Sequence, residues 1–151
     1  MSDTKIKIAV CWHSIGMYSC LFEQFYESFN KNFCNECEKT FFIFTDKPEI
    51  TIGKTNCLTY VISNSCLNID FNLYRKFKYL LMAEDKYLNY DYVIFCNGNL
   101  NCQYEVSLDE LFNSKKYFCC QHPMMATGYF QAAMFGAASN EFLKMANQIE
   151  S

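Results

Sequence analysis

The chain has 151 residues, a length typical of one domain, and 51% of them are hydrophobic and 18% aromatic. Such a composition excludes a disordered chain and suffices for a packed core. The 13 basic and 16 acidic side chains give a net charge of -3, which excludes the basic field typical of proteins that bind nucleic acid or an anionic membrane.

In the first half of the chain, short apolar runs alternate with a helical pattern. Residues 6–11 are apolar and β-branched, and they predict a buried strand. Apolar residues at helical spacing over 18–33 predict a helix. A second buried strand is predicted at 41–45, ended by a turn at 46–48, and a weaker third strand at 57–62.

The second half continues this alternation. Apolar residues over 73–88 predict an amphipathic helix, and residues 92–96 give the strongest strand pattern. Ser107 and Glu110 have the spacing of a capping box, which predicts a short helix. Later strands are predicted at 117–120 and 129–135, and a helix at 141–149 is expected to be capped by Ser139 or Asn140.

Strands that alternate with helices are typical of βαβ units and of a largely parallel sheet. We therefore predict one α/β domain over residues 1–151, with a doubly wound, Rossmann-like sheet that is flanked by helices. Ligands of such sheets bind at the carboxyl ends of the strands. The segments that follow residues 11, 45 and 96 are therefore the candidate binding loops.

The cellular location is inferred from the amino terminus and from the length of the apolar runs. Residues 1–5 lead directly into the first strand without the apolar region of a signal peptide. The apolar runs are far shorter than the roughly 20 residues that span a bilayer. We expect a cytoplasmic protein with no transmembrane segment, in which the ten cysteines are mostly buried, reduced thiols.

Two candidate loops place a glycine beside polar side chains. Residues 12–16 end in Gly16 and lack the G-x-G-x-x-G pattern, so they fit either a close approach to a nucleotide or a plain turn. In the other loop, Asn97 and Asn99 flank a glycine, and their amides could hydrogen-bond a diphosphate or a sugar hydroxyl. This triplet is also typical of a hairpin turn, although residues 100–102 do not alternate as a returning strand.

The cysteines offer a weak pattern for redox or metal chemistry. Cys34 and Cys37 form a C-x-x-C motif at the end of a predicted helix, where the helix dipole does not lower a thiol pKa. A zinc site would need further ligands, and the adjacent Cys119 and Cys120 would point to opposite faces of a strand. We interpret these residues as incidental thiols.

Two features near the carboxyl terminus are open to two interpretations. His122 directly follows a predicted strand and fits a structural hydrogen bond better than a catalytic role. Residues 129–138 mix aromatic with small side chains. That mixture fits either a wall against which a ligand packs or a core strand beneath a helix.

Taken in chain order, these segments resemble glycosyltransferase family 6, which includes the ABO blood-group transferases and shorter bacterial members. Six motifs occur in the family's order and near its spacing, from about residue 5 to residue 145. Residues 91–99 resemble the family's D-Y-L-x-x-x-D-x-D, in the N-x-N version of bacterial members. The other matches are Ile15-Gly16-x-Tyr18, residues 43–46 (Y-V-F-T-D), Leu73-Tyr74-Arg75, residues 121–123 (M/L-H-P) and residues 129–138 (Y-Y-x-G-G-x-x-G-G).

The resemblance implies a GT-A fold and transfer of galactose or N-acetylgalactosamine from a UDP-sugar to a glycan acceptor, with retention and an α1,3 bond. His122 matches an acceptor-side histidine of the family. Gln131, Ala132 and Ala133 match a triplet that helps to choose the donor sugar. The positions that match donor-binding residues are His13, Ser14, Ile15, Tyr18, Arg75 (or Lys76), Asn97 and Asn99.

The same comparison bears on the metal cofactor. Asn97 and Asn99 stand where the family has metal-binding carboxylates, and neutral amides are weak ligands for hard cations. We therefore predict that the donor binds without a metal ion. The charge of the departing UDP would then be balanced by Arg75, Lys76 and backbone N–H groups.

The chain departs from the family pattern in two places. Only residues 124–128 stand where the family has a long acceptor-binding segment, and the family's W-H-D-E-S segment, which carries its catalytic glutamate, has no counterpart. The sequence therefore assigns no catalytic residue. A catalytically inactive module that binds a UDP-sugar or another carbohydrate is the alternative function, and an unrelated doubly wound protein is a third possibility.

Overall fold

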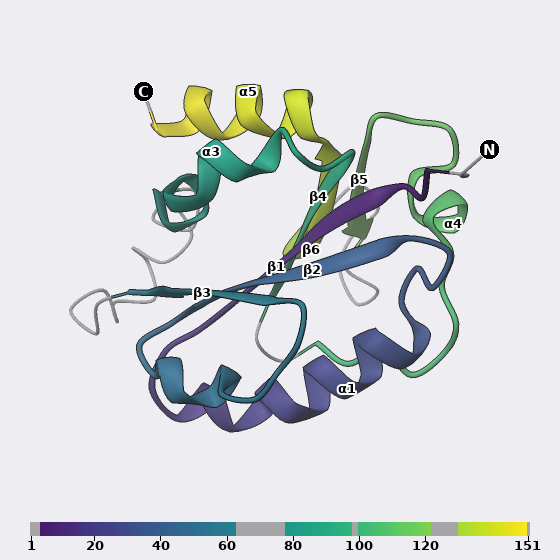
Figure 1. Ribbon diagram of the computed structural model, residues 1–151. Helices are drawn as coiled ribbons and strands as arrows, with labels where there is room; N and C mark the ends of the chain where they lie inside the picture. Colours follow the sequence, from purple (N-terminus) through teal and green to yellow (C-terminus); the bar gives the residue numbers. More distant parts are fainter. Residues whose placement is uncertain (1–3, 63–77, 98–99, 122–129, 151) are drawn as a thin grey trace.

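A sheet of six strands lies at the centre of the computed structural model, which describes residues 4–62, 78–97, 100–121 and 130–150 (Figure 1). The strands lie in the order β3-β2-β1-β4-β6-β5. Their bounds are β1 (Lys7–Ser14), β2 (Glu38–Thr45), β3 (Cys57–Val61), β4 (Tyr92–Asn97), β5 (Tyr117–Gln121) and β6 (Phe130–Ala138).

Helices cover both faces of this sheet (Figure 1). The helices α1 (Phe22–Asn32) and α4 (Leu108–Phe112) pack on one face, and α1 is preceded by the 3-10 helix η1 (Gly16–Leu21). The other face carries η4 (Leu81–Ala83), α3 (Glu84–Tyr87) and α5 (Ser139–Glu150). A further 3-10 helix, η2 (Pro48–Thr51), lies between β2 and β3.

Strand β1 shows why both faces need cover. Val10 and Trp12 belong to the core beneath α1, whereas Ala9 and Cys11 belong to the core beneath α5. All four side chains are fully buried. Successive side chains of a strand point to opposite faces, so a continuous apolar run is what a central parallel strand requires.

The predicted α/β architecture with a mostly parallel sheet is confirmed, with one addition. Strands β1, β2, β3 and β4 pair in parallel. Strand β6 pairs antiparallel with both β4 and β5, so the sheet is mixed. The sequence pattern did not predict this antiparallel edge, because apolar periodicity carries no information about which strands become neighbours.

Several predicted elements have different bounds in the structure. For example, β2 begins at Glu38 rather than at residue 41, the helix predicted over 18–33 is divided into η1 and α1, and the helix predicted at 141–149 begins at Ser139. The first strand was expected to end at residue 11, with a loop over 12–16. Instead β1 continues to Ser14, because its pairing with β4 runs to His13 and its pairing with β2 runs to Ser14. The helix predicted over 73–88 is interrupted by η4, and its residues 73–77 lie outside the described part. The capping box of Ser107 and Glu110 is confirmed at the start of α4.

Within the described residues, no helix is both long enough and apolar enough to cross a membrane.

Candidate functional site

The carboxyl ends of β1, β2 and β4 meet at one edge of the sheet. From β1 the chain passes to β2 and β3 on one side, and it later returns to β4 on the opposite side of β1. His13 is the Cα partner of Asn97 at the end of β4, and Ser14 is the partner of Thr45 at the end of β2. Such a point, where the strand order reverses, is where open α/β sheets bind ligands.

The predicted donor residues on β1 lie at this edge. The His13 ring is half-buried and stacks on Phe95 with 5.3 Å between ring centroids. Ser14 and Ile15 are buried. Tyr18 lies on η1, and 60% of it is exposed to solvent. The side chains therefore differ sharply in their access to a ligand, which the sequence did not indicate.

Two buried donors on β1 lack hydrogen-bond partners within the described residues. They are the hydroxyl of Ser14 and the indole Nε1–H of Trp12, and Ser14 is only 3% exposed. Residues at positions i and i+2 of a strand point to the same face, so both groups lie on the α1 side of the sheet. A buried polar group without a partner is destabilising by roughly 1–3 kcal/mol, which a ligand's hydrogen bond would relieve.

The loop after β1 is held by Asp46, which directly follows β2. The Asp46 carboxylate accepts the Gly16 N–H at 3.0 and 3.2 Å. Gly16 has a φ of +67°, in the left-handed region that favours glycine, and no atom lies within 4 Å of where a Cβ would stand. Gly16 is thus required by the turn, and its N–H is already occupied rather than available to a phosphate.

Asn97 ends β4, and the described residues 100–102 after it do not form a strand. Both edges of β4 are occupied, by β1 on one side and β6 on the other, so the segment that follows Asn97 does not pair back on it. The side chain of Asn97 is outside what the structure describes, as are all of Asn99, Arg75, Lys76 and His122.

Residues 131–133, the triplet predicted to help select the donor sugar, lie at the same edge of the sheet. Cys96 pairs with Met134 and β6 runs antiparallel to β4, so residues 131–133 lie beyond the carboxyl end of β4. Only their backbone is described. Further along β6, Gly136 makes room for a core side chain rather than for a ligand, because its Cβ would stand 2.5 Å from Cε1 of Phe118.

The C-x-x-C motif has the properties of buried structural thiols. Cys34 directly follows the C-cap of α1, as predicted, and has a left-handed φ of 49°. Burial raises the pKa of Cys37 to about 11 and raises that of Cys34 further still. Protonated thiols are poor nucleophiles and poor ligands. Among the described residues, no three histidine, cysteine or acidic side chains gather as metal ligands.

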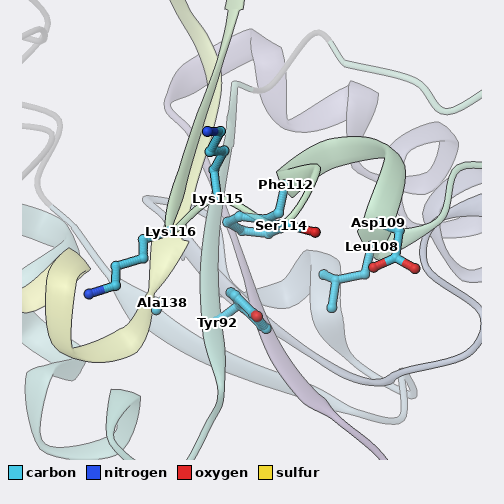
Figure 2. Close-up of a pocket in the computed structure, with 8 residues that line it drawn as sticks. All are labelled: Tyr92, Leu108, Asp109, Phe112, Ser114, Lys115, Lys116 and Ala138. Atoms are coloured by element: carbon cyan, nitrogen blue, oxygen red, sulfur yellow. The ribbon is translucent and has the colours of Figure 1, made fainter.

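A small pocket of about 210 Å³ lies at the opposite end of the strands, where β4 begins with Tyr92 and β6 ends with Ala138 (Figure 2). Its polar side chains include Asp109, Lys115 and Lys116. Figure 2 shows that these three point in different directions. Because their charged ends do not converge, we assign no ligand to this pocket.

The chain matches no protein-family model, and no curated protein matched it. Function is therefore inferred from the residues at the carboxyl edge of the sheet.

Proposed function

We propose that the carboxyl edge of β1, β2 and β4 binds a UDP-sugar, on a domain of the GT-A type. We further propose that the chain transfers the hexose, galactose or N-acetylgalactosamine, to a glycan acceptor with retention. The observation that carries the proposal is the buried hydroxyl of Ser14, which has no partner among the described residues and lies where the strand order reverses.

The chemistry of this edge supports a neutral, polar ligand group such as uracil or ribose. The hydroxyl of Ser14, which is 3% exposed, can donate one hydrogen bond. The exposed ring of Tyr18 offers an aromatic face nearby in the chain. Asn97 lies beside His13 on the neighbouring strand. Together these groups suit the nucleoside half of a donor better than a metal-bound diphosphate.

We also propose that the donor binds without a metal ion, because Asn97 and Asn99 are neutral. Arg75 and Lys76 would supply the countercharge for the diphosphate. UDP titrated by calorimetry should then give the same affinity in EDTA as in Mn²⁺. An absolute requirement for Mn²⁺ would refute this part of the proposal.

Replacing Ser14 tests the site directly. Ser14→Ala removes a buried hydroxyl with no partner among the described residues, so the free energy of unfolding without a ligand should rise, by about 1–3 kcal/mol. The affinity for UDP should nevertheless fall by about three- to tenfold, the value of one lost hydrogen bond. A loss of stability with unchanged UDP affinity would assign the hydroxyl to the fold and not to a ligand.

Asn97→Ala should likewise weaken UDP binding by about three- to tenfold, the value of one lost hydrogen bond. The matched control is Asn89→Ala, because Asn89 is exposed and precedes β4 at the opposite end of the strand. Hydrolysis of a UDP-sugar, or transfer to a β-galactoside, would establish a transferase. UDP binding without turnover would favour the inactive binding module, and no UDP binding would favour an unrelated doubly wound protein.

A further inference from the structure

A mainly apolar pocket of about 320 Å³ opens between α1 and the segment that follows β4. Its volume falls within the range of small-molecule sites, which are mostly apolar with a few polar groups. Phe29 and Phe33 form part of its lining and are themselves buried, while Tyr104 is 79% exposed. The other apolar residues of the lining are Leu100, Cys102, Val106, Leu111 and Met134.

The pocket is formed without a ligand, because the segment that makes its wall is tied to α1. The Cys102 N–H donates to Ser28 Oγ at 3.0 Å, and Asn32 Nδ2 donates to the Cys102 carbonyl at 2.7 Å. The Val106 N–H donates to the Asn32 carbonyl at 2.9 Å. A ligand therefore meets a shaped cavity, and little ordering of this segment opposes binding.

This pocket lies close to the carboxyl edge of the sheet. Leu100 follows Asn97 by three residues, so their Cα atoms are at most about 11 Å apart. Met134 is the Cα partner of Cys96, the residue before Asn97. An apolar cavity and a polar strand edge are thus separated by less than the length of an ordinary amphipathic molecule.

The charges around the pocket limit the ligand's polar group. The residues that line it include the amides Asn101 and Gln103 but no charged side chain. A neighbouring pocket shares Val106 with it and is lined by Glu105 and Glu110, among others. These carboxylates disfavour an anionic head at this surface. Lys39, the cation whose ammonium donates to the carbonyls of Phe29 and Phe33, is not among the residues that line the pocket.

We propose that this pocket binds the alkyl chain of an uncharged amphipathic ligand, such as an alkyl glycoside. The amides at the pocket and the carboxyl edge of the sheet would face its polar head. A role as the subsite for the apolar part of an acceptor rests on the proposed transferase function. The binding of the alkyl chain in this pocket does not rest on that function.

Calorimetry with methyl, butyl, hexyl and octyl β-D-galactosides, each below the concentration at which it forms micelles, tests the pocket. The affinity should rise about fourfold for each added methylene until the pocket is full. Leu100→Gln places a polar group in the lining and should abolish this dependence on chain length. Leu111→Gln provides a second variant if the first does not fold. The matched control is Leu88→Gln, at an exposed leucine that follows α3 on the other face of the sheet.

Equal affinities for the methyl and octyl compounds, or a chain-length series unaltered in both lining variants, would overturn the inference. Octanoate that binds as tightly as octyl galactoside would overturn the preference for a neutral head. If the protein self-associates and the affinity for the galactosides does not depend on alkyl length, the pocket would be assigned to a contact between two copies of the protein. A preserved alkyl series without UDP binding would sustain this inference while refuting the proposed function.

Discussion

The contact between Asp46 and Gly16 predicts that two loops at the candidate site depend on each other. The Asp46 carboxylate accepts the Gly16 N–H at 3.0 and 3.2 Å, and both residues are half-buried. The left-handed φ of Gly16 makes this turn unusual, and the carboxylate holds the N–H of Gly16 by hydrogen bonding. Asp46→Ala removes that acceptor without touching the core.

The magnitude follows from the hydrogen bond. A hydrogen bond to a charged group is worth about 1.5–3 kcal/mol, but water recovers part of this at a half-buried site. We therefore expect Asp46→Ala to lower the free energy of unfolding by about 1–2 kcal/mol, or Tm by roughly 3–6 °C. Asp46→Asn keeps an oxygen acceptor and should lose less than about 1 kcal/mol. UDP affinity should fall up to about tenfold in Asp46→Ala, because binding must then order the turn.

Urea unfolding followed by fluorescence measures the effect, because Trp12 is the chain's single tryptophan and is fully buried. Calorimetry with UDP measures the consequence for binding. Glu49→Ala is the matched control, since it removes an exposed negative charge from η2, close to Asp46 in the chain. If Asp46→Ala unfolds within about 0.3 kcal/mol of this control, the carboxylate does not hold the turn and the reasoning fails.

Two further predictions concern the packing around β6 and α5. Gly136→Ala should lower the free energy of unfolding by about 1–2 kcal/mol, because the new Cβ would collide with Phe118. Adding Phe118→Leu to this variant should restore most of the loss. A Gly136→Ala protein as stable as the wild type would contradict this reasoning. The Tyr117 hydroxyl donates to Glu141 at 2.6 Å and lowers the pKa of that carboxyl. The stability that this hydrogen bond adds is therefore present above pH about 4 and is lost as the pH falls through the lowered pKa of Glu141. The urea concentrations at which half of the wild-type protein and half of the Tyr117→Phe protein unfold should therefore differ at pH 7 and become equal in acid. A difference that stays constant with pH would disprove the link.

Much of the fold is local enough to be predicted from sequence. The apolar runs that became the cores of β2 and β4 and the capping box at Ser107 all act within a few neighbouring residues. The same holds for the expectation that the segments after the first, second and fourth strands lie at one edge, because parallel strands share a carboxyl edge. Periodicity and capping are short-range effects, and one sequence is sufficient to show them.

The tertiary structure decided what depends on distant partners. Strand β1 extends through Ser14 because Ser14 pairs with Thr45 of β2, and β6 pairs antiparallel with β4 on the edge opposite β1. Asp46 reaches Gly16 across 30 residues, and Cys102 reaches Ser28 across 74. The sequence therefore determined which segments are strands and helices. Long-range pairing determined which hydroxyl is left without a partner, which N–H is already bound, and where an apolar pocket opens beside the candidate site.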